Sequence, residues 1–308
     1  MVLATVVSTP RPRRPACWAA CREPTSRPHV AHAGGGAVTL VRDRAESSRT
    51  PSGHRGCQLS TDLLPADRET PLGRMHSRSA GTPRDGVAEV VLVQGIGVSD
   101  YLVPALRALG AWTRAHLVEL PGFSGSGEPP HELDVAEFGD ALVAWLAGAG
   151  LDRVVLVGHS GGTQVAARAA LHRPAGVRGL VLASPTVDPA FRSLGGVLRA
   201  WYRNHRREPP DLDEAHRPER QRAGTRRVLH AVRAHLADRL EDVVPRLAVP
   251  VLVLHGADDL LCTAEWARAL CRLARDGRFA SVPGAHSFVW THPGAWSGPL
   301  RRLAGEVG

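Results

Sequence analysis

The chain contains no lysine, and all 38 of its basic residues are arginine. Long apolar segments are also missing, because no run approaches the ~18 residues that a membrane-spanning helix needs. The net charge of +8 is concentrated in residues 1–60 and 191–246, whereas residues 61–190 are slightly acidic. A basic patch can indicate nucleic-acid binding, but arginine without lysine indicates compositional bias. We therefore expect neither a nucleic-acid partner nor a membrane span.

Cysteine is scarce, and the odd number and spacing of the five residues match neither a disulfide framework nor a zinc site. This usage predicts a reducing, cytoplasmic location, with packing roles for Cys262 and Cys271. The 15 histidines include no H-E-x-x-H motif, since His131-Glu132 lacks the second histidine. We therefore expect no metal ion and no cofactor.

Composition divides the chain into a tail and a globular part. Residues 1–57 are rich in Arg, Pro, Ser and Gly, and such a segment buries too little apolar surface to offset the entropy of ordering. We expect a disordered tail there, followed by one domain over 58–308. The predicted strands are 73–81 (at a sheet edge), 90–93, 116–119, 154–157 and 179–183, and the predicted helices are 100–109, 134–149 and one ending near Pro174. This alternation predicts an α/β fold with a mostly parallel, doubly wound sheet.

The alternation stops between Pro185 and Pro250. Apolar residues there follow two helical stripes, 191–201 and 229–240, separated by a polar, proline-containing stretch over 208–220. We predict a helical insertion at about 186–245. Its stripes are typical of helices packed on a core, and its arginines are typical of solvated outer faces. Contact with substrate and steering of anionic substrates are the alternatives.

The segment Gly158-His159-Ser160-Gly161-Gly162 follows one predicted strand and precedes an alanine-rich helical stretch. A G-x-S-x-G motif in this context is typical of a nucleophile elbow, the sharp turn that exposes a serine hydroxyl at the end of a sheet. Small residues suit the turn because the helix must pass close to the strand. Ser160 is therefore the candidate nucleophile, and a glycine-rich turn in an inert α/β protein is the alternative.

Two later strand ends carry candidate partners for this serine. An apolar run over 249–255 leads into Gly256-Ala257-Asp258-Asp259, and a short run over 278–282 leads into a turn with His286. A serine hydroxyl needs a base within hydrogen-bond reach, and that base needs an acid to fix its tautomer. We assign His286 as the base and Asp259 as the acid, because the G-x-x-D spacing favours Asp259 over Asp258.

Other residues near these motifs are weaker candidates. Asp188 follows the strand before the insertion and is a second alternative for the acid. His292 precedes a proline and is expected in a solvated turn, whereas His159 is expected to have a structural role inside the elbow. Ser124 and Ser126 are expected to form hydrogen bonds within a loop.

With the segments 90–97 and 119–126, these motifs resemble the α/β-hydrolase superfamily from about residue 74 to the C-terminus. Serine, aspartate and histidine also follow the chain order of that superfamily. The resemblance implies an α/β-hydrolase fold with a helical cap, and an oxyanion hole made by the backbone N–H groups of Ile96 and Gly161. The chain departs from the family pattern at three positions, Gln94, Glu119 and Ala285, where histidine, aspartate and glycine are usual.

The predicted function is that of a serine hydrolase acting on an ester or related acyl substrate through an acyl-enzyme intermediate. The same fold also hosts carbon–carbon bond hydrolases and cofactor-free perhydrolases, and these are alternatives within the enzyme class. A non-enzymatic small-molecule receptor on the same fold is the alternative outside it. The expected partner is a small acyl molecule, and the sequence leaves its identity and the oligomeric state open.

Overall fold

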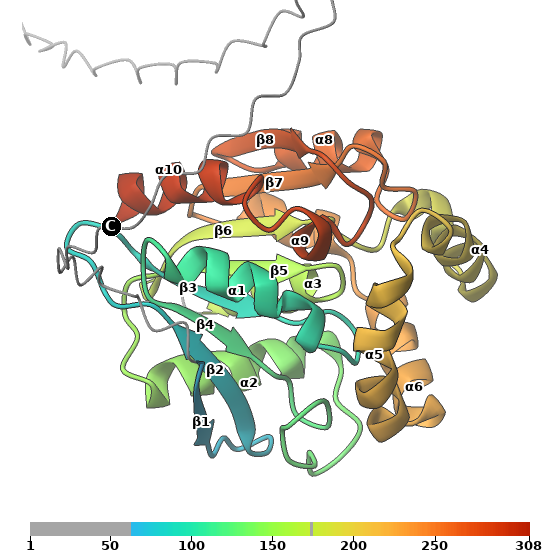
Figure 1. Cartoon of the computed structure of the whole chain (residues 1–308), viewed down its shortest axis with the longest axis horizontal. Helices are drawn as coiled ribbons and strands as arrows, with labels where there is room; N and C mark the ends of the chain where they lie inside the picture. The colour runs from blue at the N-terminus through green and yellow to red at the C-terminus, as the bar shows by residue number, and fades with distance from the viewer. Residues whose placement is uncertain (1–62, 173–174) are drawn as a thin grey trace, which may run out of the picture. The chain divides into compact units, whose positions relative to one another are not determined.

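Eight strands form one sheet in the order β1-β2-β4-β3-β5-β6-β7-β8 (Figure 1). The computed structural model describes residues 63–172 and 175–308, so the predicted tail over 1–57 lies outside the described residues. β1 and β2 pair antiparallel, and the remaining strands are parallel to one another. The strands are β1 (Leu64–Arg68), β2 (Met75–Ala80), β3 (Glu89–Val93), β4 (Ala115–Val118), β5 (Val154–His159), β6 (Val177–Ala183), β7 (Val251–Gly256) and β8 (Gly277–Val282).

The central strands are continuous runs of apolar, largely β-branched residues, as expected for a parallel sheet covered on both faces. Every residue of β5 and β7 is buried. The predicted mostly parallel sheet is confirmed. A strand does lie within 73–81, but its predicted place at the sheet edge is wrong. β2 lies between β1 and β4, and the exposed strand β1 forms the edge. The sequence of β1, LPADR, has no apolar alternation that would have marked it as a strand.

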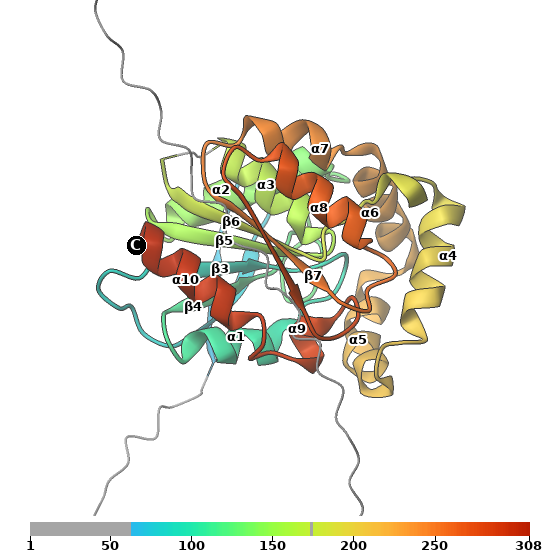
Figure 2. The same ribbon diagram turned by 90° about the horizontal axis from the view of Figure 1, so that it is seen from above.

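Helices cover both faces of the sheet, and Figure 2 shows the two layers. One layer holds α2 (Val135–Gly148), α3 (Gly162–His172), α7 (Leu240–Val243) and α8 (Ala264–Leu273). The other holds α1 (Val103–Gly110), α9 (Phe288–Thr291) and α10 (Ser297–Val307). The start of α2 is confirmed in detail, because Asp134 and Glu137 form the capping box that their spacing predicts.

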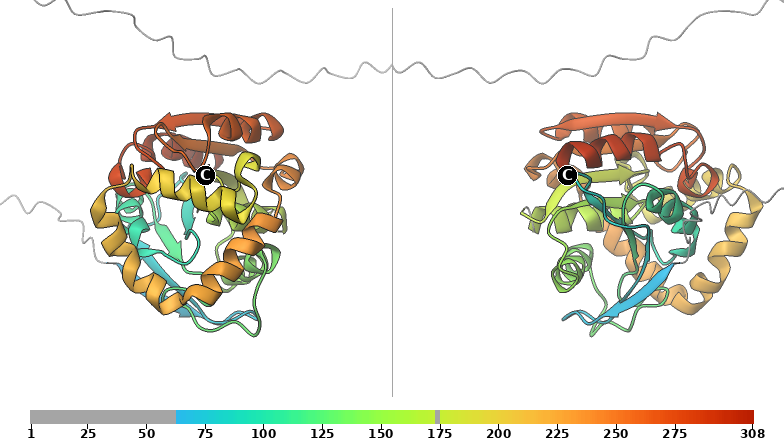
Figure 3. Two further views of the ribbon diagram at one scale, coloured as in Figure 1. Left: turned by 90° about the vertical axis from the view of Figure 1, so that its right-hand side faces the viewer. Right: turned by 60° about the vertical axis from the view of Figure 1, so that its left-hand side comes forward.

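Between β6 and β7 the chain forms a helical insertion, by which we mean α4 (Leu194–His205), α5 (Pro210–Ala223), α6 (Thr225–Ala237) and α7. Figure 3 shows α4, α5 and α6 arranged around one end of the sheet, the end at which the parallel strands finish. The polar stretch over 208–220 is mostly α5, with Pro218 inside the helix. None of the helices in the described ranges is long and apolar enough to cross a membrane.

Candidate active site

The turn from β5 to α3 holds Ser160 in a left-handed backbone conformation, with φ of 54°. This conformation is costly for a residue with a side chain, and the surrounding packing must enforce it. Two glycines permit the turn, because a Cβ on Gly158 would lie 2.3 Å from the Gly162 carbonyl oxygen. A Cβ on Gly162 would in turn lie 2.4 Å from the carbonyl oxygen of Gln94. The motif therefore brings the serine to the end of β5 and packs it beside the loop that follows β3.

The side chains of Ser160, His286 and Asp259 form one hydrogen-bonded chain. Ser160 Oγ lies 2.8 Å from His286 Nε2, and His286 Nδ1 lies 2.9 Å from Asp259 Oδ2. The other carboxylate oxygen, Asp259 Oδ1, accepts the backbone N–H groups of Leu261 and Cys262 at 2.8 and 2.9 Å. Because the aspartate accepts a hydrogen bond from Nδ1–H, it leaves Nε2 of a neutral imidazole free to accept the serine proton.

The electrostatics of these three side chains favour the charged form of His286 and the ionised form of Asp259. Burial alone would lower the pKa of His286, but the charge and the hydrogen bond of Asp259 outweigh burial and raise that pKa above its usual value. Burial alone would raise the pKa of Asp259, but His286 and the Cys262 N–H keep it below its usual value. The imidazolium that would form on proton transfer from Ser160 is therefore stabilised.

The alternative acids and bases lie elsewhere. The Asp258 carboxylate lies 3.8 Å from Arg207, and neither of these exposed side chains belongs to the chain of contacts at Ser160. Asp188 accepts the Thr263 hydroxyl at 2.6 Å. His292 contacts its neighbour Thr291 at 2.8 Å. Only Asp259, of the three candidate acids, contacts His286 among the described residues.

His159 joins the elbow to the histidine loop. Its Nε2 lies 2.9 Å from the carbonyl oxygen of His286, which can only accept, so the ring proton is on Nε2. Its Nδ1 then accepts the hydroxyl of Tyr101 at 2.6 Å. Burial lowers the pKa of His159 to about 3, so the ring is neutral near pH 7. Its contacts hold the loops together, in agreement with a structural role.

The residues expected to form the oxyanion hole are adjacent. A Cβ on Gly161 would lie 2.6 Å from Ile96 Cγ1, so the turn after β3 packs directly on the elbow. Tyr101 supports the same turn, because its hydroxyl would lie 2.8 Å from a Cβ on Gly95. Gln94, at a position where histidine is usual, is buried and accepts the Leu120 N–H at 3.2 Å. An amide at this position can therefore brace the neighbouring loop.

A cavity of about 400 Å³ includes Ser160 and His286 in its lining. Most of the remaining lining comes from the helical insertion and is apolar. The apolar contributors include Val197, Leu198, Trp201, Leu212, Val228, Val232 and Leu236, with Ile96 and Val98 from the loop after β3. A concave, mainly apolar pocket with convergent polar groups at one point is typical of a small-molecule site.

A sequence profile of the Alpha/beta hydrolase family matches residues 90–297. The chain belongs to this family. Two kinds of hydrolase occur by name among the curated relatives. One is a pimeloyl-[acyl-carrier protein] methyl ester esterase of Shewanella woodyi, 37% identical over 30% of this chain and 34% of the relative. The match thus spans only about a third of that esterase. The other is a putative carbamate hydrolase, RutD, of Klebsiella pneumoniae, 27% identical over 68% of this chain and 85% of the relative.

Solved structures agree on the fold of this α/β hydrolase. A thermophilic esterase from Thermogutta terrifontis superposes with a TM-score of 0.63 and 22% identity, covering 79% of this chain and 99% of that one. At this identity the likeness establishes a shared fold and nothing finer.

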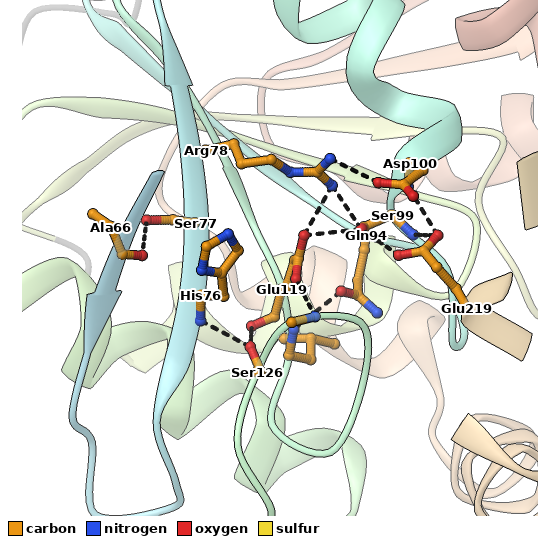
Figure 4. A network of polar contacts seen from close by, with 12 residues as sticks. Ala66, His76, Ser77, Arg78, Gln94, Ser99, Asp100, Glu119, Ser126 and Glu219 are labelled. Carbon is orange, nitrogen blue, oxygen red and sulfur yellow. Dashed lines mark hydrogen bonds and ion pairs between the residues drawn. The ribbon is translucent and has the colours of Figure 1, made fainter. Parts of the chain in front are cut away.

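Figure 4 shows a polar network through which this α/β hydrolase ties α5 to the loop after β3. Glu219 of α5 is 1% exposed and accepts the backbone N–H groups of Ser99 and Asp100 at 2.8 and 2.9 Å. Glu119, at a position where aspartate is usual, accepts Arg78 at 2.8 Å and the Gly125 N–H at 2.6 Å. The glutamate therefore still braces its loop. The network holds the segment just downstream of Ile96.

A second link joins the end of α4 to the candidate acid and base. Asn204 Oδ1 accepts the N–H of Leu260, the residue after Asp259, at 3.1 Å. Asn204 Nδ2 donates to Glu208 Oε1 at 2.8 Å. The same Oε1 accepts the N–H of Ser287, the residue after His286, at 2.9 Å. The insertion thus contacts both loops that carry the partners of Ser160.

Sequence reasoning missed Tyr101, Asn204, Glu208, His216 and Glu219. Tyr101 lies in a segment predicted as a helix, where the apolar residues around it are the only sequence signal that it is buried. Asn204, His216 and Glu219 lie on helices of the insertion and Glu208 lies in the turn between α4 and α5, in a segment whose charged residues are typical of solvated faces. The spacing of 212, 216, 219 and 223, which are the buried residues of α5, follows one helical face and was the signal available.

Proposed function

We propose that this α/β hydrolase is a serine hydrolase that cleaves carboxylic esters, with Ser160 as nucleophile, His286 as general base and Asp259 as the acid that orients it. The single observation that supports the proposal most strongly is the pair of contacts at 2.8 and 2.9 Å that joins the three side chains. The names of the relatives are consistent with it, since one is a methyl ester esterase and another a putative carbamate hydrolase.

In the proposed reaction, His286 Nε2 accepts the proton of Ser160 Oγ as the oxygen attacks the ester carbonyl. The negative charge that develops on the carbonyl oxygen is stabilised by the N–H groups of Ile96 and Gly161. The positive end of α3, an 11-residue helix beginning at Gly162, contributes to the same stabilisation.

Collapse of the tetrahedral intermediate breaks the bond to the alcohol, which takes the proton from His286 Nε2. Ser160 is left as an acyl ester. A water molecule, deprotonated by the same nitrogen, attacks this ester. Collapse of the second tetrahedral intermediate releases the acid, and Ser160 Oγ takes the proton back from His286 Nε2. Asp259 stays ionised throughout and stabilises the imidazolium in both halves of the reaction.

We further propose that the helical insertion is the cap of this enzyme. It supplies most of the apolar lining of the cavity and therefore sets which acyl and alcohol groups fit, rather than the chemical step. Cytoplasmic location belongs to the same proposal and rests on the cysteine usage alone.

The test is labelling with a fluorophosphonate probe, which reacts with an activated serine, together with hydrolysis of short-chain esters. We expect the wild-type protein to be labelled at Ser160 and to hydrolyse esters. Ser160→Ala should abolish labelling and lower kcat by roughly 10⁴–10⁶ with an unchanged melting temperature. A Ser160→Ala protein that retains more than a few per cent of the activity would contradict the assignment. A carbon–carbon bond hydrolase would be labelled but would leave the esters intact, and a receptor would bind them without turnover.

A further inference from the structure

The apolar cavity contains polar atoms that the protein itself leaves unpaired. Among the described residues, Thr186 Oγ1, Glu208 Oε2 and His216 Nε2 are buried, line the cavity and have no hydrogen-bond partner. Unpaired buried polar atoms are rare in folded proteins, so we expect a bound molecule to supply the hydrogen-bond partner of each. A substrate made only of hydrocarbon around its ester would leave all three unpaired.

Glu208 is the one of these residues whose place relative to the reaction is fixed. Its Oε1 is held by two donors, Asn204 Nδ2 at 2.8 Å and the Ser287 N–H at 2.9 Å. Ser287 follows His286 directly, and the charge of Glu208 is one of the influences that raise the pKa of His286. Oε1 thus serves as an anchor, and Oε2 is left as an acceptor beside the candidate base.

Neighbouring arginines do not satisfy this oxygen. Arg207 lies 3.8 Å from the carboxylate of Asp258. Arg220 donates to Asp213 and to His216 Nδ1, at 3.2 and 2.9 Å. An ionised carboxylate can only accept, so the partner of Oε2 must bring an O–H or N–H group.

We propose that Glu208 Oε2 recognises a hydrogen-bond donor on the alcohol part of the substrate. The inference rests on the proposed function, in which His286 delivers a proton to the leaving alcohol, so that groups beside His286 border the alcohol rather than the acyl chain. The preferred substrates are then esters of alcohols that carry a further O–H or N–H group near the ester. Esters of plain alkyl alcohols are poorer substrates, because they leave Oε2 buried and unpaired.

The experiment compares three esters of one short-chain acid. The 2-hydroxyethyl ester can donate a hydrogen bond, the 2-methoxyethyl ester can only accept one, and the propyl ester can do neither. We expect wild-type kcat/KM to be at least about tenfold higher for the hydroxyethyl ester than for the propyl ester, because a site built around a hydrogen bond discriminates more strongly than an apolar pocket.

Glu208→Gln keeps an oxygen for the two anchoring donors and turns an NH₂ group towards the cavity. The hydroxyl of the hydroxyethyl ester can still accept from that NH₂ group, but it loses the stronger bond to a charged oxygen, so the hydroxyethyl-to-propyl ratio should fall severalfold. The methoxyethyl ester, which can now accept a hydrogen bond, should gain relative to both others. Glu208→Asp keeps the charge but withdraws the oxygen, and it should lower the same ratio. Glu241→Gln is the matched control, because Glu241 pairs with Arg192 on the insertion and does not line the cavity. It should leave the ratio unchanged.

The intrinsic reactivities of the esters cancel when ratios are compared between variants. Equal ratios in the wild type, Glu208→Gln and Glu208→Asp would overturn this inference while leaving the proposed function intact. A fall of the same size in Glu241→Gln would also overturn it, because the ratio would then report a loosened insertion. If the wild type cleaves none of the esters and Ser160 is not labelled, this inference and the proposed function both fail.

Discussion

The loops at the ends of β5, β7 and β8 and the helices of the insertion contribute to one cavity in different ways. The loops supply Ser160, Asp259 and His286, each from a short motif whose residues are consecutive in the sequence. The insertion supplies isolated polar residues, such as Asn204, Glu208 and Glu219, which act on the loops across more than 50 residues of sequence. Under the proposed function, the strand-end motifs carry the reaction and the insertion selects the substrate, while the contacts of the insertion also hold the loops.

The largest loss of activity among these variants should come from Asp259, the candidate acid at the end of β7. Asp259→Asn is expected to lower kcat by roughly 10⁴, because the amide no longer holds the tautomer that leaves His286 Nε2 free. Asp258→Asn is the matched control on the adjacent residue. It should cost less than about tenfold, because the Asp258 carboxylate is exposed and pairs with Arg207 rather than with His286. Steady-state kinetics of both variants decide the matter, and a reversal of the two effects would place the wrong aspartate in the site.

The sheet and the candidate site could be predicted because each depends on local sequence. The buried strands are apolar runs, and the elbow needs Gly158 and Gly162 at fixed positions beside the serine. The contacts of the insertion could not be predicted, because they depend on where α5 lies against the loop after β3. Glu219 is polar and follows a proline in its helix. Only the folded structure shows that its side chain is buried and accepts two backbone N–H groups. The edge strand β1 was not predicted for a related reason. It is a strand because it pairs with β2, and its own sequence has no strand pattern.

A smaller effect should follow when the insertion loses its hold on the loop after β3. Glu219→Ala removes the acceptor of two backbone N–H groups and of the Ser99 hydroxyl, and should cost about 3 kcal/mol of unfolding free energy. Glu214→Ala, at an exposed position of α5, is the matched control and should change stability by less than about 0.5 kcal/mol. Urea denaturation measures both. Comparable losses in the two variants would mean that the network in Figure 4 contributes nothing beyond helix propensity.

The ester turnover of Glu219→Ala should also change. If Ile96 depends on the loop that Glu219 holds, ester turnover by Glu219→Ala should fall severalfold at temperatures where the protein is still folded. Unchanged turnover would show that the loop after β3 does not need the insertion to hold its position. The strand-end loops would then carry the reaction without help from the insertion.

The smallest effect should appear in the pH dependence of kcat/KM. His286 must be neutral to accept the serine proton, so activity should fall as pH drops through its pKa, which Asp259 and, more weakly, Glu208 raise above the usual value. Glu208→Gln removes one negative charge beside the imidazole, so protonation becomes less favourable and the acid limb should move to lower pH. Glu241→Gln should leave the limb in place. A pH–rate profile on the propyl ester, which cannot bond to Oε2, separates this charge effect from substrate recognition. An acid limb that coincides in all three proteins would show that the insertion acts on the substrate alone and leaves the base to Asp259.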